Sequence, residues 1–263
     1  MNTKLTIGQY FTGDSTLHRL DPRVKITLTI AYMALVFLAS GWAGYGIVAA
    51  FMLGCIWLSG VPIRMVLRSL RPLLYIIIFT FVLNILFTQT GTEIFKFWII
   101  RLTDEGLVRS VQMALRLAFL VMGTSLLTLT TSPIQLTDGM EALLSPLKRI
   151  GFPAHEMAMM MTIALRFIPT LLDEADKIMK AQMARGADFE SGNLIERARG
   201  MVPLLVPLFI SAVRRADELA MAMESRCYCG GDGRTRMTVL KAAPRDAYAA
   251  AAVVAVGVLL VLV

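Results

Sequence analysis

The sequence is poor in charge and in cysteine. Only 17% of its 263 residues are charged, against about 25% in a typical soluble domain. Its three cysteines, Cys55, Cys227 and Cys229, are odd in number, and the first lies in an apolar run. This pattern predicts no disulfide framework. Residues 1–23 are mixed and polar rather than a short apolar core with a small-residue cleavage site, so we expect no cleaved signal peptide.

Sequence motifs for catalysis are also missing. A glycine-rich phosphate loop with its lysine is absent, which argues against ATP binding by this chain. Neither His-Glu-x-x-His nor Gly-x-Ser-x-Gly occurs, which disfavours a membrane protease or esterase. His155 with Cys227 and Cys229 would leave a zinc site one ligand short. We therefore predict no catalytic residue, no metal site and no cofactor.

Apolar residues are abundant and are gathered into long runs. They make up 56% of the chain, and the mean hydropathy is +0.65. A helix needs about 20 apolar residues to cross a bilayer. Five runs qualify as candidate spans: Val24–Ser40, Trp42–Gly60, Pro72–Gln89, Gly106–Thr131 and Asp246–Val263. The predicted fold class is all-α, a polytopic membrane helical bundle of about five spans.

The basic residues predict how this bundle is oriented. Arg64, Arg68 and Arg71 lie between the second and third runs, whereas the loop between the first two runs has no Lys or Arg. Basic loops face the cytoplasm. We therefore place the N-terminus inside and the C-terminus outside, and we attribute the net charge of +7 to this bias rather than to nucleic acid binding.

One long segment, residues 132–245, differs from the rest and is predicted to be cytoplasmic. It holds 15 of the 26 basic and 13 of the 19 acidic residues. Its apolar stretches, Pro153–Leu172 and Gly200–Val213, are interrupted or short, which favours amphipathic helices over spans. The expected domains are a membrane region of four spans (1–131), a helical coupling domain (132–245) and a last span (246–263).

The inserted segment contains an internal repeat. When Glu174–Gly186 is laid over Arg215–Cys227, small and apolar positions coincide and Arg185 matches Arg226. Each copy follows a proline-containing apolar stretch and ends at a helix-stopping signal. A helix C-terminus carries about half a negative charge, which alone would explain an arginine in the last turn. Because the guanidinium still projects with five donors, two matched tips also suggest two equivalent docking sockets.

With these motifs in view, the chain resembles the transmembrane T component of energy-coupling factor (ECF) transporters, a family that includes CbiQ-like proteins. The run Gly13–Lys25 is similar to the family's entry into its first span, and Ala184-Arg185-Gly186 has the family's arginine-motif form. Ser225-Arg226-Cys227 keeps the arginine, but cysteine stands where members often have glycine.

The resemblance implies a division of labour in a bacterial or archaeal cell membrane. Two ABC-type ATPase subunits would hydrolyse ATP, and a small membrane-embedded subunit would bind the vitamin or transition-metal ion. This chain would couple the two as a non-catalytic subunit. The implied ATPase-docking residues are Ala184, Arg185, Gly186, Ser225, Arg226 and Cys227.

Methionines indicate a second contact surface. The chain has 17, and methionine suits surfaces that repack against several partners, although it also fills cores. We take Met157, Met159, Met160 and Met161 as the candidate contact with the substrate-binding subunit.

The main alternative is a self-contained secondary transporter or channel, and a membrane-embedded enzyme is a third. A carrier should place several ionisable groups at mid-bilayer, whereas the predicted spans have few beyond Arg116. Arg116 could snorkel, pair or contact a partner, and Asn84 is expected to bond across helices.

Overall fold

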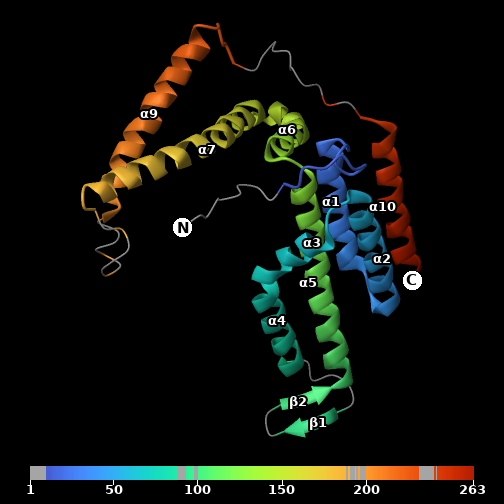
Figure 1. The fold of residues 1–263 in the computed structure, drawn as a ribbon. Coiled ribbons are helices and arrows are strands. Elements are labelled where there is room, and N and C mark those ends of the chain that lie inside the picture. Colours follow the sequence, from blue (N-terminus) through green and yellow to red (C-terminus); the bar gives the residue numbers. More distant parts are fainter. Residues whose placement is uncertain are drawn as a thin grey trace. The chain divides into compact units, whose positions relative to one another are not determined.

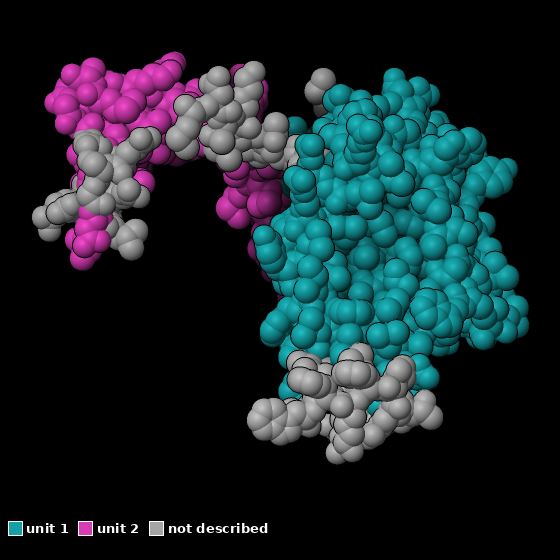
Figure 2. Space-filling model, turned by 60° about the horizontal axis from the view of Figure 1, so that its bottom comes forward, with its two compact units in different colours: residues 1–143, 239–263 teal, residues 144–238 magenta. Residues whose placement is uncertain are grey.

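The computed structural model describes residues 10–87, 93–97, 100–187, 189, 193, 195, 200–230, 240 and 242–263. The chain forms two compact units, coloured separately in Figure 2. Unit 1 comprises residues 1–143 and 239–263, and unit 2 comprises residues 144–238. These boundaries differ from the expected 131/132 and 245/246. Which segments lie in the membrane and which in the cytoplasm stays a prediction.

Unit 1 is a helical bundle in which α5 is the central helix (Figure 1). Its helices are α1 (Pro22–Leu38), α2 (Gly41–Ser59), α3 (Ile63–Leu70), the 3-10 turn η1 (Arg71–Leu73), α4 (Leu74–Phe87), α5 (Asp104–Thr130), α6 (Pro133–Leu144) and α10 (Pro244–Leu262). Helices α1 to α4 pack against α5, and α10 packs against α1 and α2. The core centres on Val36, Val48 and Leu129, each almost fully buried.

The prediction of an all-α membrane bundle is confirmed, with one short hairpin added. Among the described residues, four helical segments are long and apolar enough to span a membrane: Gly41–Ser59, Ile63–Ile85, Asp104–Thr130 and Pro244–Leu262. Helix α1, at 17 residues, lies at the lower end of span lengths. A short antiparallel hairpin of β1 (Glu93–Phe97) and β2 (Ile100–Thr103) joins α4 to α5. The arginines expected in a loop lie instead on α3 and η1.

A glycine permits the close approach of α1 and α5. A Cβ atom on Gly123 would lie 2.4 Å from Cε1 of Tyr32, so no larger residue fits without a shift of the ring. The Tyr32 hydroxyl donates to the carbonyl of Phe119 at 3.2 Å. The helices are therefore joined by shape and by a hydrogen bond.

Two polar residues of the predicted spans have local partners. Arg116 donates to the carbonyl of Ala39 at 3.2 Å and lies 5.8 Å from the ring centroid of Phe37. It thereby caps the C-terminal end of α1, where a cation is favoured by the helix dipole. Asn84 donates to the carbonyl of Thr80 on its own helix, so the expected bond across helices is wrong.

Unit 2 is built mainly from two long helices, α7 (Ala154–Ala184) and α9 (Val202–Glu224). The predicted apolar stretches and the two repeat copies merge into these continuous helices, with Pro169 inside α7 and Pro207 inside α9. The C-terminal part of α7 lies beside the N-terminal part of α9 (Figure 1). A 3-10 turn, η2 (Ser145–Ile150), precedes α7 and packs on it.

Candidate functional site

Helix α7 ends in a specific C-terminal motif with Arg185 as its cap residue. The amide of Gly186 donates to the carbonyl of Met183 at 3.0 Å, and the amide of Ala187 donates to that of Gln182 at 2.9 Å. These are the two bonds of a Schellman motif, which requires a left-handed residue after the cap. Gly186 supplies it with a φ of +87°.

Helix α9 ends in the same motif, at the equivalent positions of the repeat. The amide of Cys227 donates to the carbonyl of Glu224 at 2.9 Å, and the amide of Tyr228 donates to that of Met223 at 3.1 Å. Cys227 has a φ of +57°, the one positive value outside glycine in the part of the chain that the structure describes. The turn found at Gly186 is therefore kept at Arg226, although cysteine replaces glycine.

Both arginine tips are open to a partner. The six residues of the two tips are exposed: Ala184, Arg185, Gly186, Ser225, Arg226 and Cys227. Within the described ranges, neither guanidinium takes part in an ion pair. Each sits where the helix ends with unpaired carbonyls and a partial negative charge, so it is held locally while its donors remain available.

A polar contact links the two helices between these tips. Arg215 Nη2 lies 2.7 Å from Glu174 Oε2, and the hydroxyl of Ser211 donates to Glu174 Oε1. The hydrogen bond from Ser211, followed by that from Arg215, lowers the pKa of Glu174 below its usual range. The carboxylate is therefore ionised at neutral pH.

The helices run antiparallel from this contact. A cavity of about 610 Å³ lies between residues early in α7, such as Met159 and Ile163, and residues late in α9, such as Leu219 and Arg226. The start of α7 thus faces the end of α9. The two arginine tips consequently lie at opposite ends of the pair.

The four methionines proposed as a contact surface divide between two faces. Met157, Met160 and Met161 are exposed, as their spacing on one side of a helix requires. Met159 is half-buried and lines the cavity beside Arg226. The structure therefore brings three of the four together.

Helix α9 carries a longer apolar surface, in the stretch that its sequence predicts to be amphipathic. Its exposed members recur every three or four residues: Val202, Leu205, Val206, Phe209, Ile210 and Val213. They share one side of the helix, roughly opposite to Ser211 and Arg215, which face α7. The 3.6-residue period of Gly200–Val213 indicates this surface, but it does not show which partner contacts each face of the helix.

The residues around His18 have a structural role. Lys25, 6% exposed, donates from Nζ to the carbonyls of His18 and Thr130 at 3.1 and 3.0 Å, and to the hydroxyl of Thr131 at 3.3 Å. The ammonium is thus fully engaged. This contact joins the start of α1 to the end of α5.

A second contact joins the same region to α10. The carboxylate of Asp246 accepts from the amide of Asp21 at 3.0 Å and from the amide of Ala243 at 2.7 Å. A lysine inside the first apolar run and an aspartate at the start of the last could have indicated this cluster. The N-terminal motif that carried the resemblance therefore organises the bundle.

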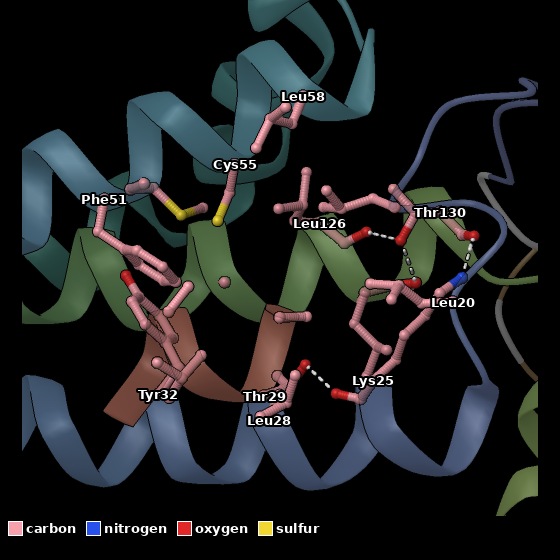
Figure 3. A pocket seen from close by; sticks show the side chains of 17 residues that line it. Leu20, Lys25, Leu28, Thr29, Tyr32, Phe51, Cys55, Leu58, Leu126 and Thr130 are labelled. Carbon is pink, nitrogen blue, oxygen red and sulfur yellow. Dashed lines mark hydrogen bonds between the residues drawn. The ribbon is translucent and has the colours of Figure 1, made fainter. Parts of the chain in front are cut away.

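A cavity of about 190 Å³ opens beside this cluster in unit 1. Figure 3 shows Lys25 and Thr130 at one end and Tyr32 and Phe51 at the other. The lining is mostly apolar, and Lys25 is turned to its three acceptors. Among the described residues, no group of three or more His, Cys, Asp or Glu could hold a metal ion.

Comparisons with known proteins agree over most of the chain. The family CbiQ, described as cobalt transport protein, matches residues 13–238. A protein of Thermosediminibacter oceani is 59% identical over 97% of this chain and 96% of its own length. Relatives from Clostridium kluyveri and Bacillus subtilis are 58% and 50% identical, over 92% and 90% of this chain and 90% and 89% of their own. All three are named energy-coupling factor transporter transmembrane protein EcfT.

Proposed function

We propose a function from one established premise: this chain belongs to the CbiQ family of cobalt transport proteins. Like its EcfT relatives, it is the energy-coupling transmembrane component of an energy-coupling factor transporter. In our proposal it transmits the motion of ATPase subunits to a separate membrane subunit that binds the substrate. The substrate class is vitamins or transition-metal ions.

One observation carries this proposal. Two exposed arginines lie at the ends of two helices whose terminal hydrogen-bond patterns coincide when the repeat copies are aligned. A cap needed only for its own helix would not have to recur with the same backbone turn, least of all with cysteine in a left-handed conformation. Two equal tips fit two ABC-type ATPase subunits, each accepting one guanidinium in an acidic or carbonyl-lined groove.

The apolar surfaces of unit 2 support a partner within the membrane or at its surface. The exposed stripe of α9 and the methionines Met157, Met160 and Met161 would be unfavourable in water. Helix α9 presents its polar side to α7 and its apolar side outward, which suits a lipid surface or an apolar subunit. We assign the substrate-binding subunit to this surface.

We place the chain in the cell membrane with the N-terminus and unit 2 in the cytoplasm. Arg64, Arg68 and Arg71 lie in the first nine residues of the candidate span Ile63–Ile85, shortly after the span Gly41–Ser59 ends. Positive-inside logic assigns a basic span end of this kind to the cytoplasm. This orientation puts both tips where ATP is available. ATP hydrolysis then belongs to the partner subunits, and this chain contributes no catalytic residue.

Alanine at the two tips tests the docking assignment. In the transporter complex, R185A and R226A should each weaken retention of the ATPases on the tagged chain, and the double variant should abolish substrate uptake. Truncating one partner of a buried charged contact costs about 2–5 kcal/mol. R185K should rescue poorly because an ammonium lacks the planar fork.

Matched controls are available on the same helices. Arg166 on α7 and Arg214 on α9 lie away from the tips, so R166A and R214A should leave retention and uptake intact. Wild-type ATPase retention and uptake in the R185A/R226A double variant would refute the assignment.

A further inference from the structure

The contact between α7 and α9 joins positions that the repeat makes equivalent. Glu174 aligns with Arg215 when the two copies are superposed in sequence, and these two side chains form the ion pair. When two equivalent helices pack antiparallel about a local two-fold axis, a residue meets its own equivalent at that axis. The pair therefore marks the axis of the repeat.

The two arginine tips are equidistant from this point. The interval from Glu174 to Arg185 in α7 equals the interval from Arg215 to Arg226 in α9. At about 1.5 Å per residue, each tip is roughly 16 Å from the contact along its own helix. We call this arrangement a lever: its two arms are Glu174–Arg185 of α7 and Arg215–Arg226 of α9, and the polar contact lies at its centre.

The hydrogen bonds at this contact hold α7 and α9 together at one point. One carboxylate accepts from both Arg215 and Ser211, so one side chain of α7 is held by two side chains one turn apart on α9. Beyond it, the cavity of about 610 Å³ separates the start of α7 from the end of α9. The part of α9 from Arg215 to Arg226 is thus less constrained than the centre.

We propose that Glu174, Ser211 and Arg215 form the pivot of the lever and set the separation of the two arginine tips. They are positioning residues, and this role rests on the proposed docking function. With the pivot intact, a movement imposed by a partner at one tip reaches the other tip. A partly exposed ion pair adds little to stability, so its contribution lies in geometry.

A distance measurement tests the pivot without any partner. Lys180 and Met221 are equivalent in the repeat, are exposed, and lie outside the docking motifs. Spin labels at K180C and M221C, in a C55S/C227S/C229S background, should give one narrow distance distribution. E174R and R215E, which each place like charges together, should broaden or shift it, and the double variant E174R/R215E should restore it.

Neighbouring residues provide matched controls. D176R and R214E make comparable charge changes on the same helices and should leave the distribution narrow. Should a reversal fail to yield folded protein, E174Q removes the charge alone and should still broaden the distribution. An unchanged distribution in E174R, R215E and E174Q, or a swap that does not restore it, would overturn the pivot.

Transport separates the pivot from docking. In the transporter complex, the single reversals should retain the ATPases but lower uptake per ATP hydrolysed by about three- to tenfold, a range typical of residues that modulate coupling between sites. The swap should recover it. Failure of the unmodified chain to retain the ATPases would instead refute docking, and it would leave the distance result standing.

Discussion

At the scale of the residue, positions 186 and 227 show the same backbone turn formed once by glycine and once by cysteine. Gly186 adopts a left-handed φ without a steric penalty, whereas Cys227 adopts it with a Cβ atom. For an L-residue this conformation costs about 1–2 kcal/mol. The bonds from Cys227 and Tyr228 to the end of α9 offset that cost.

Exchanging glycine and a side chain at these turns should have opposite effects. C227G should stabilise the end of α9 by about 1 kcal/mol, and G186A should destabilise the end of α7 by a similar amount, because only glycine is unstrained at positive φ. Hydrogen exchange of the last-turn amides measures both. Reduced protection in C227G would contradict the strain argument.

The arginines of the tips could be predicted from the sequence, but the turn at Cys227 could not. Aligning the two repeat copies places Arg185 over Arg226 without any structure. Cysteine is not a residue that favours a left-handed conformation, so only the hydrogen bonds show that the second turn matches the first. The ion pair between Glu174 and Arg215 was also hidden, because aligned residues need not touch.

At the scale of the element, α7 and α9 are longer than their local patterns indicate. Pro169 and Pro207 each remove one backbone hydrogen bond and suggest a break. Packing of α7 against α9 compensates for this local cost. Helix α3 shows the same limit: its arginines predict a loop by charge, yet Val66 on its other side is fully buried and Ser69 bonds to Ser125 of α5.

Lowering the pH should break the contact between Glu174 and α9 only in the acidic range, well below neutral pH. Because the pKa of Glu174 is lowered in the folded state, its stabilising effect is full above the unfolded value, about 4.3, and is lost as the pH falls through the lower folded value. The K180C–M221C distance distribution should therefore stay narrow from neutral pH to about 4.3 and broaden only below it. E174Q should lack this transition, and broadening of the unmodified pair near neutral pH would contradict the assignment.

At the scale of the whole molecule, hydrophobic length predicted the fold class, and charge predicted an orientation that is still to be tested. Runs such as Trp42–Gly60 can form spans because helices satisfy every backbone group in lipid. The β1–β2 hairpin was not predicted because its strands have only five and four residues, and the alternation in Ile100–Thr103 is too short to stand out between apolar runs. Lys25 and Asp246 stand out as charged residues at the start of apolar runs, but the groups that they bind come from distant parts of the sequence, which no local pattern identifies.

The orientation of the whole chain is the remaining prediction, and native cysteines can test it. Cys227 and Cys229 are exposed beside the Arg226 tip, and Val263 is exposed at the end of α10. If basic segments face the cytoplasm, a membrane-impermeant maleimide should label the native cysteines only in inside-out vesicles. V263C, in a C55S/C227S/C229S background, should be labelled only in right-side-out vesicles. Labelling of Cys227 from the outside would place Arg226 away from ATP, and no cytoplasmic ATPase could then dock there.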